Sequence, residues 1–206
     1  MKPKYSEFYD FGGAIVATTL ASTPDMWEKY IADKEFDKAH NYQWALCYGD
    51  YGDITFPVIY HQEKYNYVKK ARDVINPGFI HLLLISDRFK NLLEENGITG
   101  WQTYPIELYD RKGNLVEGYN GFTIIGRAGD MLTFDSPPEE FGYSPKSKGY
   151  YFNVDLWDGT DIFHVRPNFI LITSRLAELL IKHKISGVSI ARLTDYGDWK
   201  KDKRIL

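Results

Sequence analysis

The feature of this sequence that most constrains its fold is an internal repeat at an offset of 87 residues. Residues 83–93 align without a gap with residues 170–180, and the match continues to Gly100 and Gly187. Each copy has an apolar run, a Ser or Thr that suits a helix N-cap, an amphipathic stretch of about three turns, and an Ile-x-Gly exit. The repeat fits a duplicated strand–helix unit, and it equally fits one helix start used twice. The identical pairs are Leu84/Leu171, Ile85/Ile172, Arg88/Arg175, Leu92/Leu179, Leu93/Leu180, Ile98/Ile185 and Gly100/Gly187.

Three segments are predicted to be helices. Residues 86–96 and 173–184, which belong to the two copies, each place three Leu or Phe residues on one face. A further helix is predicted after Thr23, which suits the N-cap, with Pro24 in the first turn. The apolar stripe of this helix consists of Trp27, Tyr30 and Ile31.

Strands are predicted to fill most of the remaining sequence. Aromatic residues make up 16% of the chain, and they favour pleated, half-buried surfaces. Asp158-Gly159 predicts a hairpin turn between the last two strands. The sequence thus predicts an α+β fold, mainly antiparallel strands and hairpins with about three amphipathic helices, in a single globular unit over residues 1–206. The predicted strands are 106–109, 115–119, 122–125, 150–156 and 161–165.

Composition and charge exclude several classes of protein. The chain has 25 Lys and Arg against 28 Asp and Glu, a net charge of −3, whereas a dedicated nucleic-acid binder shows a basic excess. Its single Cys, Cys47, excludes an internal disulfide and favours a reducing compartment. The apolar stretch 14–21 is too short to span a bilayer and makes a poor signal peptide. We therefore expect a cytoplasmic protein without a membrane or a direct nucleic-acid partner.

Most catalytic signatures are missing from the sequence. It has no phosphate-binding GxxxxGK[ST] loop, no GxSxG nucleophile elbow and no HExxH zinc motif, and its five His are scattered. Cys47 follows an apolar run and is interpreted as a small buried residue. We therefore predict no catalytic residue, no metal ligand and no cofactor.

One acidic cluster leaves an alternative open. Asp155, Asp158 and Asp161 lie close together in the sequence, and converging carboxylates can hold a cation or act as an acid–base pair. The spacing favours turn chemistry, in which Asp accepts local backbone hydrogen bonds. A metal-dependent hydrolase built on these three residues remains the alternative. Arg88 and Arg175, in the first turns of two predicted helices, are expected to be solvated or paired with a carboxylate.

Several short motifs in the second half of the chain resemble motifs of a known protein family. They comprise residues 100–108 (GWQTYPIEL), 118–119, 149–152, 157–163 (WDGTDIF) and 173–180. Over residues 77–190 this pattern resembles a family of bacterial immunity proteins that accompany polymorphic contact-dependent toxins and were first catalogued as a domain of unknown function. Residues 1–76 match only loosely, through an aromatic amino-terminal strand.

The resemblance implies a non-enzymatic α+β protein that binds a cognate toxin domain in the cytoplasm and blocks it by occlusion. No catalytic residue carries over from the family. Many toxins of such systems are nucleases with basic grooves, and acidic groups on an inhibitor complement these. Residues 1–103 carry 11 basic against 14 acidic residues, so an acidic face is expected mainly in this half.

The segment 135–148 is the predicted contact loop. It is long, rich in Pro and Ser, and combines acidic with aromatic side chains. A small-ligand-binding module with Tyr and Trp lining its pocket is another alternative, and a homodimer stays open as well. The predicted contact residues are Glu139, Glu140, Phe141 and Tyr143.

Overall fold

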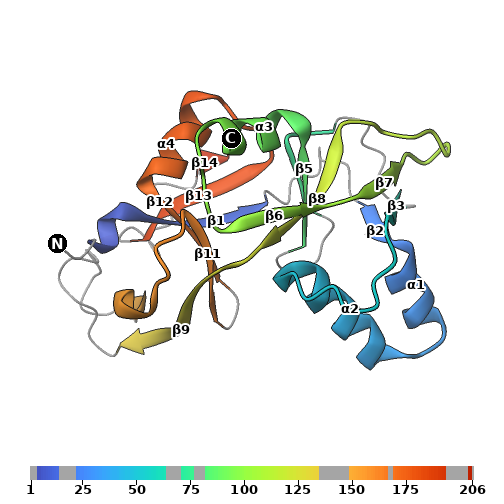
Figure 1. Cartoon of the computed structure of the whole chain (residues 1–206), viewed down its shortest axis with the longest axis horizontal. Helices are drawn as coiled ribbons and strands as arrows, with labels where there is room; N and C mark the ends of the chain where they lie inside the picture. The colour runs from blue at the N-terminus through green and yellow to red at the C-terminus, as the bar shows by residue number, and fades with distance from the viewer. Residues whose placement is uncertain are drawn as a thin grey trace. The chain divides into compact units, whose positions relative to one another are not determined.

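The computed structural model describes residues 4–13, 22–63, 71–76, 82–134, 149–166, 169–193 and 204–205. These residues form an α+β fold, as predicted (Figure 1). The α-helices are α1 (Asp25–Ala32), α2 (Phe36–Tyr48), α3 (Asp87–Glu95) and α4 (Ser174–Lys182). The strands are β1 (Phe8–Gly13), β2 (Ser22–Pro24), β3 (Val58–Gln62), β4 (Val74–Ile75), β5 (Leu83–Ser86), β6 (Trp101–Tyr104), β7 (Ile106–Tyr109), β8 (Tyr119–Ile124), β9 (Gly126–Phe134), β10 (Gly149–Phe152), β11 (Ile162–Arg166), β12 (Phe169–Thr173), β13 (Val188–Arg192) and β14 (Arg204–Ile205).

The chain divides into two compact units, each built from separate stretches of sequence. Unit 1 comprises Met1–Gly12, Gly97–Trp101 and Ile125–Leu206, and unit 2 comprises Gly13–Asn96 and Gln102–Ile124. Among the described residues, unit 1 is built on a sheet with the strand order β10-β9-β11-β12-β1-β13-β14. Unit 2 contains the sheets β2-β3-β7 and β4-β5-β8-β6.

The strand–helix parts of the two repeat copies lie in different units, residues 83–93 in unit 2 and residues 170–180 in unit 1, and they fold alike. In unit 2, β4 pairs antiparallel with β5, and α3 follows; in unit 1, β11 pairs antiparallel with β12, and α4 follows. The likeness extends past the aligned residues, because β8 lies between β5 and β6 just as β1 lies between β12 and β13. A shared strand order beyond the matched sequence favours a duplicated unit over a helix start used twice.

In unit 2 a buried aspartate ties the hairpin to the helix. The Ser86 hydroxyl caps α3 by accepting the amide of Phe89 at 3.2 Å, and it donates to Asp73 Oδ1 at 2.9 Å. Arg88 Nη1 lies 2.7 Å from Asp73 Oδ2. Only 10% of the Asp73 side chain is exposed, so the carboxylate joins β4, the cap and the first turn of α3 in one network.

Unit 1 repeats this network with different residues. Thr173 caps α4 and donates its hydroxyl to Asp161 Oδ1 at 3.0 Å, while Arg175 Nη1 lies 3.2 Å from Asp161 Oδ2. Asp161 Oδ2 also accepts the amide and the hydroxyl of Thr99. Of the two expectations for Arg88 and Arg175, solvation or pairing with a carboxylate, the structure shows pairing for both.

The core of unit 2 contains a buried pair of tyrosines. The hydroxyls of Tyr60 and Tyr104 lie 2.8 Å apart, and neither side chain is more than 2% exposed. Gly121 on β8 lies against the Tyr104 ring, where a Cβ atom would collide with it. The remaining buried members of this core are Leu46, Cys47, Val58, Ile75, Leu82, Leu84 and Leu108.

The core of unit 1 is centred on the ring of Phe8 in β1. Phe8 makes edge-to-face contacts with Phe152 and Trp157, with ring centroids 5.0 and 5.1 Å apart, and a third with Phe163 at 5.8 Å. Such pairs add about 0.5–1.5 kcal/mol each beyond the area that they bury. The aromatic amino-terminal strand is therefore a central element of this core.

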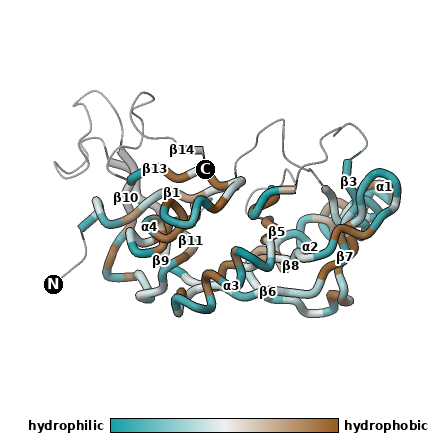
Figure 2. Tube along the Cα trace, turned by 90° about the horizontal axis from the view of Figure 1, so that it is seen from above, coloured by the Kyte–Doolittle hydropathy of each residue, from teal (hydrophilic) through white to brown (hydrophobic). Residues whose placement is uncertain are grey.

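The helix predictions inside the repeat are confirmed. Ser86 and Thr173 are the N-caps, and α3 and α4 begin and end 87 residues apart. Figure 2 shows hydrophobic and hydrophilic residues alternating along α3, the pattern from which it was predicted. Gly97, after α3, has a φ of +57°, which explains the glycine that ends this helix.

Two local predictions are wrong. Thr23 belongs to β2 and donates its hydroxyl to Glu28, so Pro24 takes the N-cap position of α1. In the predicted strand 115–119, Leu115 forms only an isolated bridge to Tyr109, and β8 begins at Tyr119. Contacts with residues far away in the sequence decide which residue caps a helix and where a strand begins. The local spacing of residues does not reveal these contacts.

The predicted hairpin through Asp158-Gly159 is also wrong. β10 and β11 both pair with β9, which lies between them. The predicted strand 150–156 ends at Phe152, and a short 3₁₀ helix follows at Val154–Leu156. The intervening strand β9 was not predicted, and neither was α2.

We expect the substitution Asp161→Ala to destabilise the protein by about 2–3 kcal/mol, because it leaves the Thr173 and Thr99 hydroxyls and the Arg175 guanidinium without their acceptor. Urea unfolding followed by circular dichroism measures this loss. Glu178→Ala, at an exposed position of α4, is the matched control and is expected to stay within about 0.5 kcal/mol of the wild type. Equal stability of the two variants would contradict the role given to Asp161.

We expect the protein to lose stability at alkaline pH. Burial raises the pKa of Cys47 from 9.0 to about 12 and the pKa of Tyr119 from 10.0 to about 12, and it raises the pKa of Tyr60 and Tyr104 well above 10.0. Because these groups lose protons more readily in the unfolded chain, their contribution is full below pH 9 and declines as the pH rises toward 12.

Absorbance at 295 nm during a pH titration tests this expectation. Some of the 16 tyrosines should ionise only above the ordinary tyrosine range, together with loss of structure. Tyr60→Phe should reduce the amplitude of that late phase. If all tyrosines ionised in one step within the ordinary tyrosine range while the fold stayed intact, this expectation would be contradicted.

Candidate functional site

The predicted contact loop lies outside the described residues. Glu139, Glu140, Phe141 and Tyr143 belong to the segment 135–148, of which the structure describes nothing. Their role in binding therefore stays a prediction. The site described below is built from other residues.

Asp158 and Asp161 of the predicted acidic cluster serve separate local networks, and the backbone amide of Asp155 donates to Asn153 Oδ1. Asp158 accepts the amide and hydroxyl of Thr160 and the amide of Arg127, as turn chemistry requires. Asp161 belongs to the network at the start of α4. Within the described ranges, no three His, Cys, Asp or Glu side chains form a group that could hold a metal ion.

Cys47 is buried in the core of unit 2, as predicted. Its side chain is 0% exposed, and burial raises the pKa of its thiol to about 12. A thiol in this setting stays protonated at neutral pH, and the thiolate is the form that reacts. The side chain acts as a small apolar core residue.

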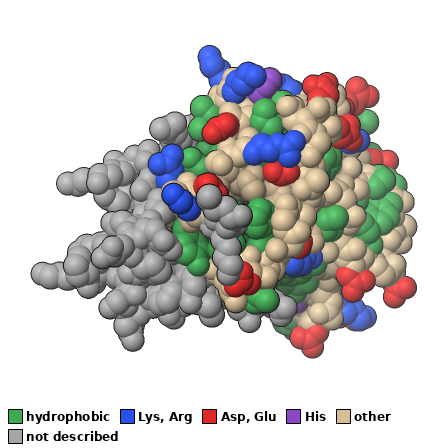
Figure 3. Space-filling model, turned by 60° about the vertical axis from the view of Figure 1, so that its left-hand side comes forward, with side chains coloured by type: hydrophobic (Ala, Val, Ile, Leu, Met, Phe, Trp, Pro, Cys, Tyr) green, Lys and Arg blue, Asp and Glu red, His purple; other side chains and the backbone are tan. Residues whose placement is uncertain are grey.

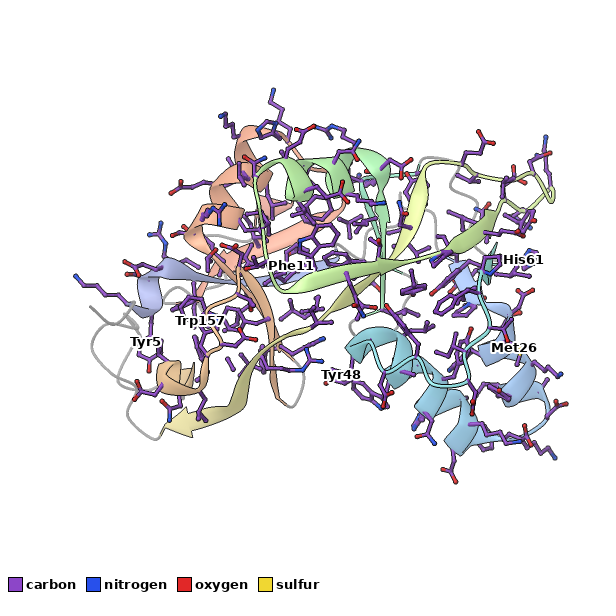
Figure 4. All side chains as sticks on the ribbon, in the orientation of Figure 1. Tyr5, Phe11, Met26, Tyr48, His61 and Trp157 are labelled. Carbon is purple, nitrogen blue, oxygen red and sulfur yellow. The ribbon has the colours of Figure 1, made fainter. Side chains whose placement is uncertain are left out.

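One concave surface formed by described residues lies entirely within unit 2. It is a hollow of about 300 Å³ between α1, α2 and the loop that follows α2. We call it the α1–α2 hollow. Figure 1 shows the two helices side by side, and Figure 4 labels Met26 on α1, one of the residues that line it. The lining residues are Met26, Tyr30, Lys38, Asn41, Tyr42, Ala45 and 50–55.

Tyrosine rings form three of the walls. Tyr30 of α1 and Tyr42 of α2 meet edge to face with ring centroids 6.1 Å apart. Tyr51 is anchored from behind, since its hydroxyl lies 2.9 Å from Thr123 Oγ1 and accepts from Gln102 Nε2 at 3.2 Å. The Thr123 hydroxyl also donates to the carbonyl of Leu46 at 2.6 Å, which ties this wall to α2.

The Tyr42 hydroxyl is held in its neutral form. Burial raises the pKa of Tyr42 to about 12, and the nearby Tyr30 and Asp25 push it in the same direction. Tyr42 therefore presents a neutral ring to the hollow at physiological pH.

The surroundings of the hollow are acidic. Residues 25–55, the α1–α2 lobe, contain seven Asp and Glu against three Lys, a net charge of −4 where the whole chain has −3. Lys38, which lines the hollow, is offset by Glu35, whose Oε1 lies 2.7 Å from its Nζ. Asp50 and Asp53 are exposed at the rim.

The end of α2 adds to the negative potential. A helix C-terminus carries a partial negative charge, and the last turn of α2 contains no basic residue. Gly49, with a φ of +80°, ends the helix and turns the chain toward Asp50. The carbonyl end of α2 and the Asp50 carboxylate thus reinforce each other beside the hollow.

Hydrophobic side chains are exposed in the same lobe. Met26 is 38% exposed and Phe36 is 57% exposed. Figure 3 turns the left-hand side of Figure 1 toward the reader, and on that face hydrophobic, acidic and basic side chains are scattered among other residue types. Apolar anchors surrounded by charged groups are the usual composition of protein-binding surfaces.

A histidine–aspartate contact joins α1 and β3. His61 Nε2 lies 3.1 Å from Asp25 Oδ2, and the imidazole stacks on the Tyr109 ring with centroids 5.3 Å apart. Burial raises the pKa of Asp25 and outweighs the opposite effect of His61. Sequence reasoning missed this contact, which depends on the placement of β3 between β2 and β7. It missed the hollow because the hollow needs α2, which was not predicted.

Comparison with known protein families and with curated proteins found no match to this chain. No helix among the described residues is both long and apolar enough to cross a membrane.

We expect Thr123→Val to destabilise the protein by about 1–2 kcal/mol, because it removes the hydrogen bonds to Leu46 and Tyr51 from a side chain that is 0% exposed. Thr103→Val, on β6 of the same unit, is the matched control and should stay within about 0.5 kcal/mol. Chemical unfolding measures both. Thr123→Val indistinguishable from Thr103→Val would show that Thr123 does not anchor the hollow.

Proposed function

We propose that this chain is a non-enzymatic immunity protein, which binds a cognate bacterial toxin domain in the cytoplasm and blocks it by occlusion. The single observation that carries the proposal is the excess of acidic side chains around an aromatic hollow in residues 25–55. The resemblance of residues 77–190 to bacterial immunity proteins supports it independently. Two contact regions are proposed separately: the α1–α2 lobe of unit 2 and the loop 135–148, which is predicted from the sequence alone.

Physical chemistry connects this surface to a basic partner. A negatively charged patch steers a positively charged protein toward it and can raise the association rate by about 10- to 1,000-fold at low salt. Exposed Met26 and Phe36 supply apolar anchors, which slow dissociation once the partner has docked. A toxin domain with a basic substrate groove presents the complementary charge.

The second candidate is a small-ligand-binding module. Its support is also the α1–α2 hollow, since pockets for drug-sized molecules run from about 300 to 1,000 Å³. The hollow stands at the lower end of this range, so it has room for a small group rather than for a large cofactor. No arrangement of the described aspartates favours the metal-dependent hydrolase.

Co-expression with the product of the gene beside its own tests the proposed function. If the proposal is right, the carboxy-terminal domain of that product is toxic alone, growth is restored with this chain, and the two proteins purify together. Toxicity without rescue or complex formation rejects that pairing. A panel of small ligands in a thermal-shift assay then tests the second candidate.

Charge reversal tests the contact surface. We expect Asp33→Lys combined with Asp53→Lys to slow association with the toxin domain by about tenfold at low salt, with a smaller effect at high salt. Both residues are exposed on the α1–α2 lobe. The control is Glu94→Lys with Glu95→Lys, which makes the same charge change at exposed positions of α3. Equal slowing in both double variants would indicate only a net-charge effect and would remove the lobe from the interface.

A separate pair of substitutions tests the loop. Phe141→Ala with Tyr143→Ala should weaken the complex, and unchanged affinity would exclude the loop 135–148 as a contact region.

A further inference from the structure

We infer that the α1–α2 hollow is a receptor for one arginine side chain, presented by a basic partner protein. The inference deepens the proposed function and depends on it for the identity of the partner. It does not depend on it for the binding of an arginine group, which can be measured directly.

The rings in the hollow suit a flat cation. A guanidinium group stacks on aromatic faces, and the negative face of a tyrosine ring attracts it. The ring planes of Tyr30 and Tyr42 are inclined at 69° to each other, so the two rings are not stacked face to face and a ring face stays available to a guanidinium group. Tyr51, fixed by Thr123 and Gln102, supplies a further wall without having to be ordered on binding.

The charges point to the same ligand class. Asp50 and Asp53 at the rim are exposed, so their carboxylates are accessible to a guanidinium fork. Lys38 is the one basic residue among those that line the hollow, and its ammonium group is engaged by Glu35. The carbonyl end of α2 favours a cation at this place and disfavours an anion.

The size of the hollow selects a side chain over a larger ligand. At about 300 Å³ and open to solvent, it matches a long, narrow group that enters from outside. Met26 can pack against the aliphatic stem of an arginine while the guanidinium lies among the rings. Arginine is preferred over lysine because its planar group can use both stacking and bidentate hydrogen bonds.

Binding of a small probe to the full chain tests the inference. The probe is N-acetyl-arginine methylamide, titrated into the ¹⁵N-labelled protein to concentrations in the tens of millimolar. Amide shifts should concentrate in α1, α2 and residues 50–55. The matching citrulline compound has the same length without the charge, and it should bind at least about threefold more weakly.

Variants of the rim supply the matched control. Asp50→Asn with Asp53→Asn should weaken binding of the arginine probe by about two- to fivefold, whereas Glu94→Gln with Glu95→Gln on α3 should leave it unchanged. Equal binding of the citrulline compound, shifts scattered over α3, or preferential binding of N-acetyl-glutamate methylamide in the hollow would each overturn the inference.

The two proposals can fail separately. If the probe binds the hollow and no toxin is neutralised, the arginine receptor stands and the immunity function falls. If a toxin is neutralised while the probe does not bind and Asp50→Asn with Asp53→Asn keeps full affinity, the immunity function stands and the arginine receptor falls.

Discussion

The interaction on which both units depend is the buried carboxylate that joins a hairpin to the helix after it. In unit 2 Asp73 bonds to the cap hydroxyl of Ser86, and in unit 1 Asp161 bonds to that of Thr173. An arginine in the first helical turn neutralises each carboxylate, at 2.7 and 3.2 Å. The side chains of both aspartates are 10% exposed, so an unpaired charge there would be strongly unfavourable. Strand, cap and helix must therefore form together in each copy.

An element of this fold could be predicted from the sequence where the residues that determine it lie close together along the chain. α3 and α4 were predictable, because the cap residue and the apolar face lie within one short segment. α2 was not, since its buried residues Ala39, Leu46 and Cys47 lie among polar and aromatic positions that blur the helical period. The strand β9 lies between β10 and β11 and pairs with both. The Asp158-Gly159 turn signal gives no indication of this pairing.

The candidate site, too, could be predicted only where its features depend on residues close together in the sequence. The acidic bias of the amino-terminal half was visible from the sequence, and the α1–α2 lobe is where that charge concentrates. The hollow itself was not, because it needs α2 and a Tyr51 hydroxyl held by Thr123, 72 residues away along the chain. The turn role of Asp158 was predictable from local chemistry, whereas the burial of Asp161 beside Thr99 depends on a contact between distant segments.

We propose that the acidic, aromatic α1–α2 lobe is the surface that binds the toxin domain. Hydrogen exchange of the backbone amides, measured by mass spectrometry with and without the purified toxin domain, tests it most directly. We expect added protection over residues 25–55 and 135–148, with the protection of α3 and α4 unchanged. Protection confined to other segments, with residues 25–55 exchanging as in the free protein, would contradict it.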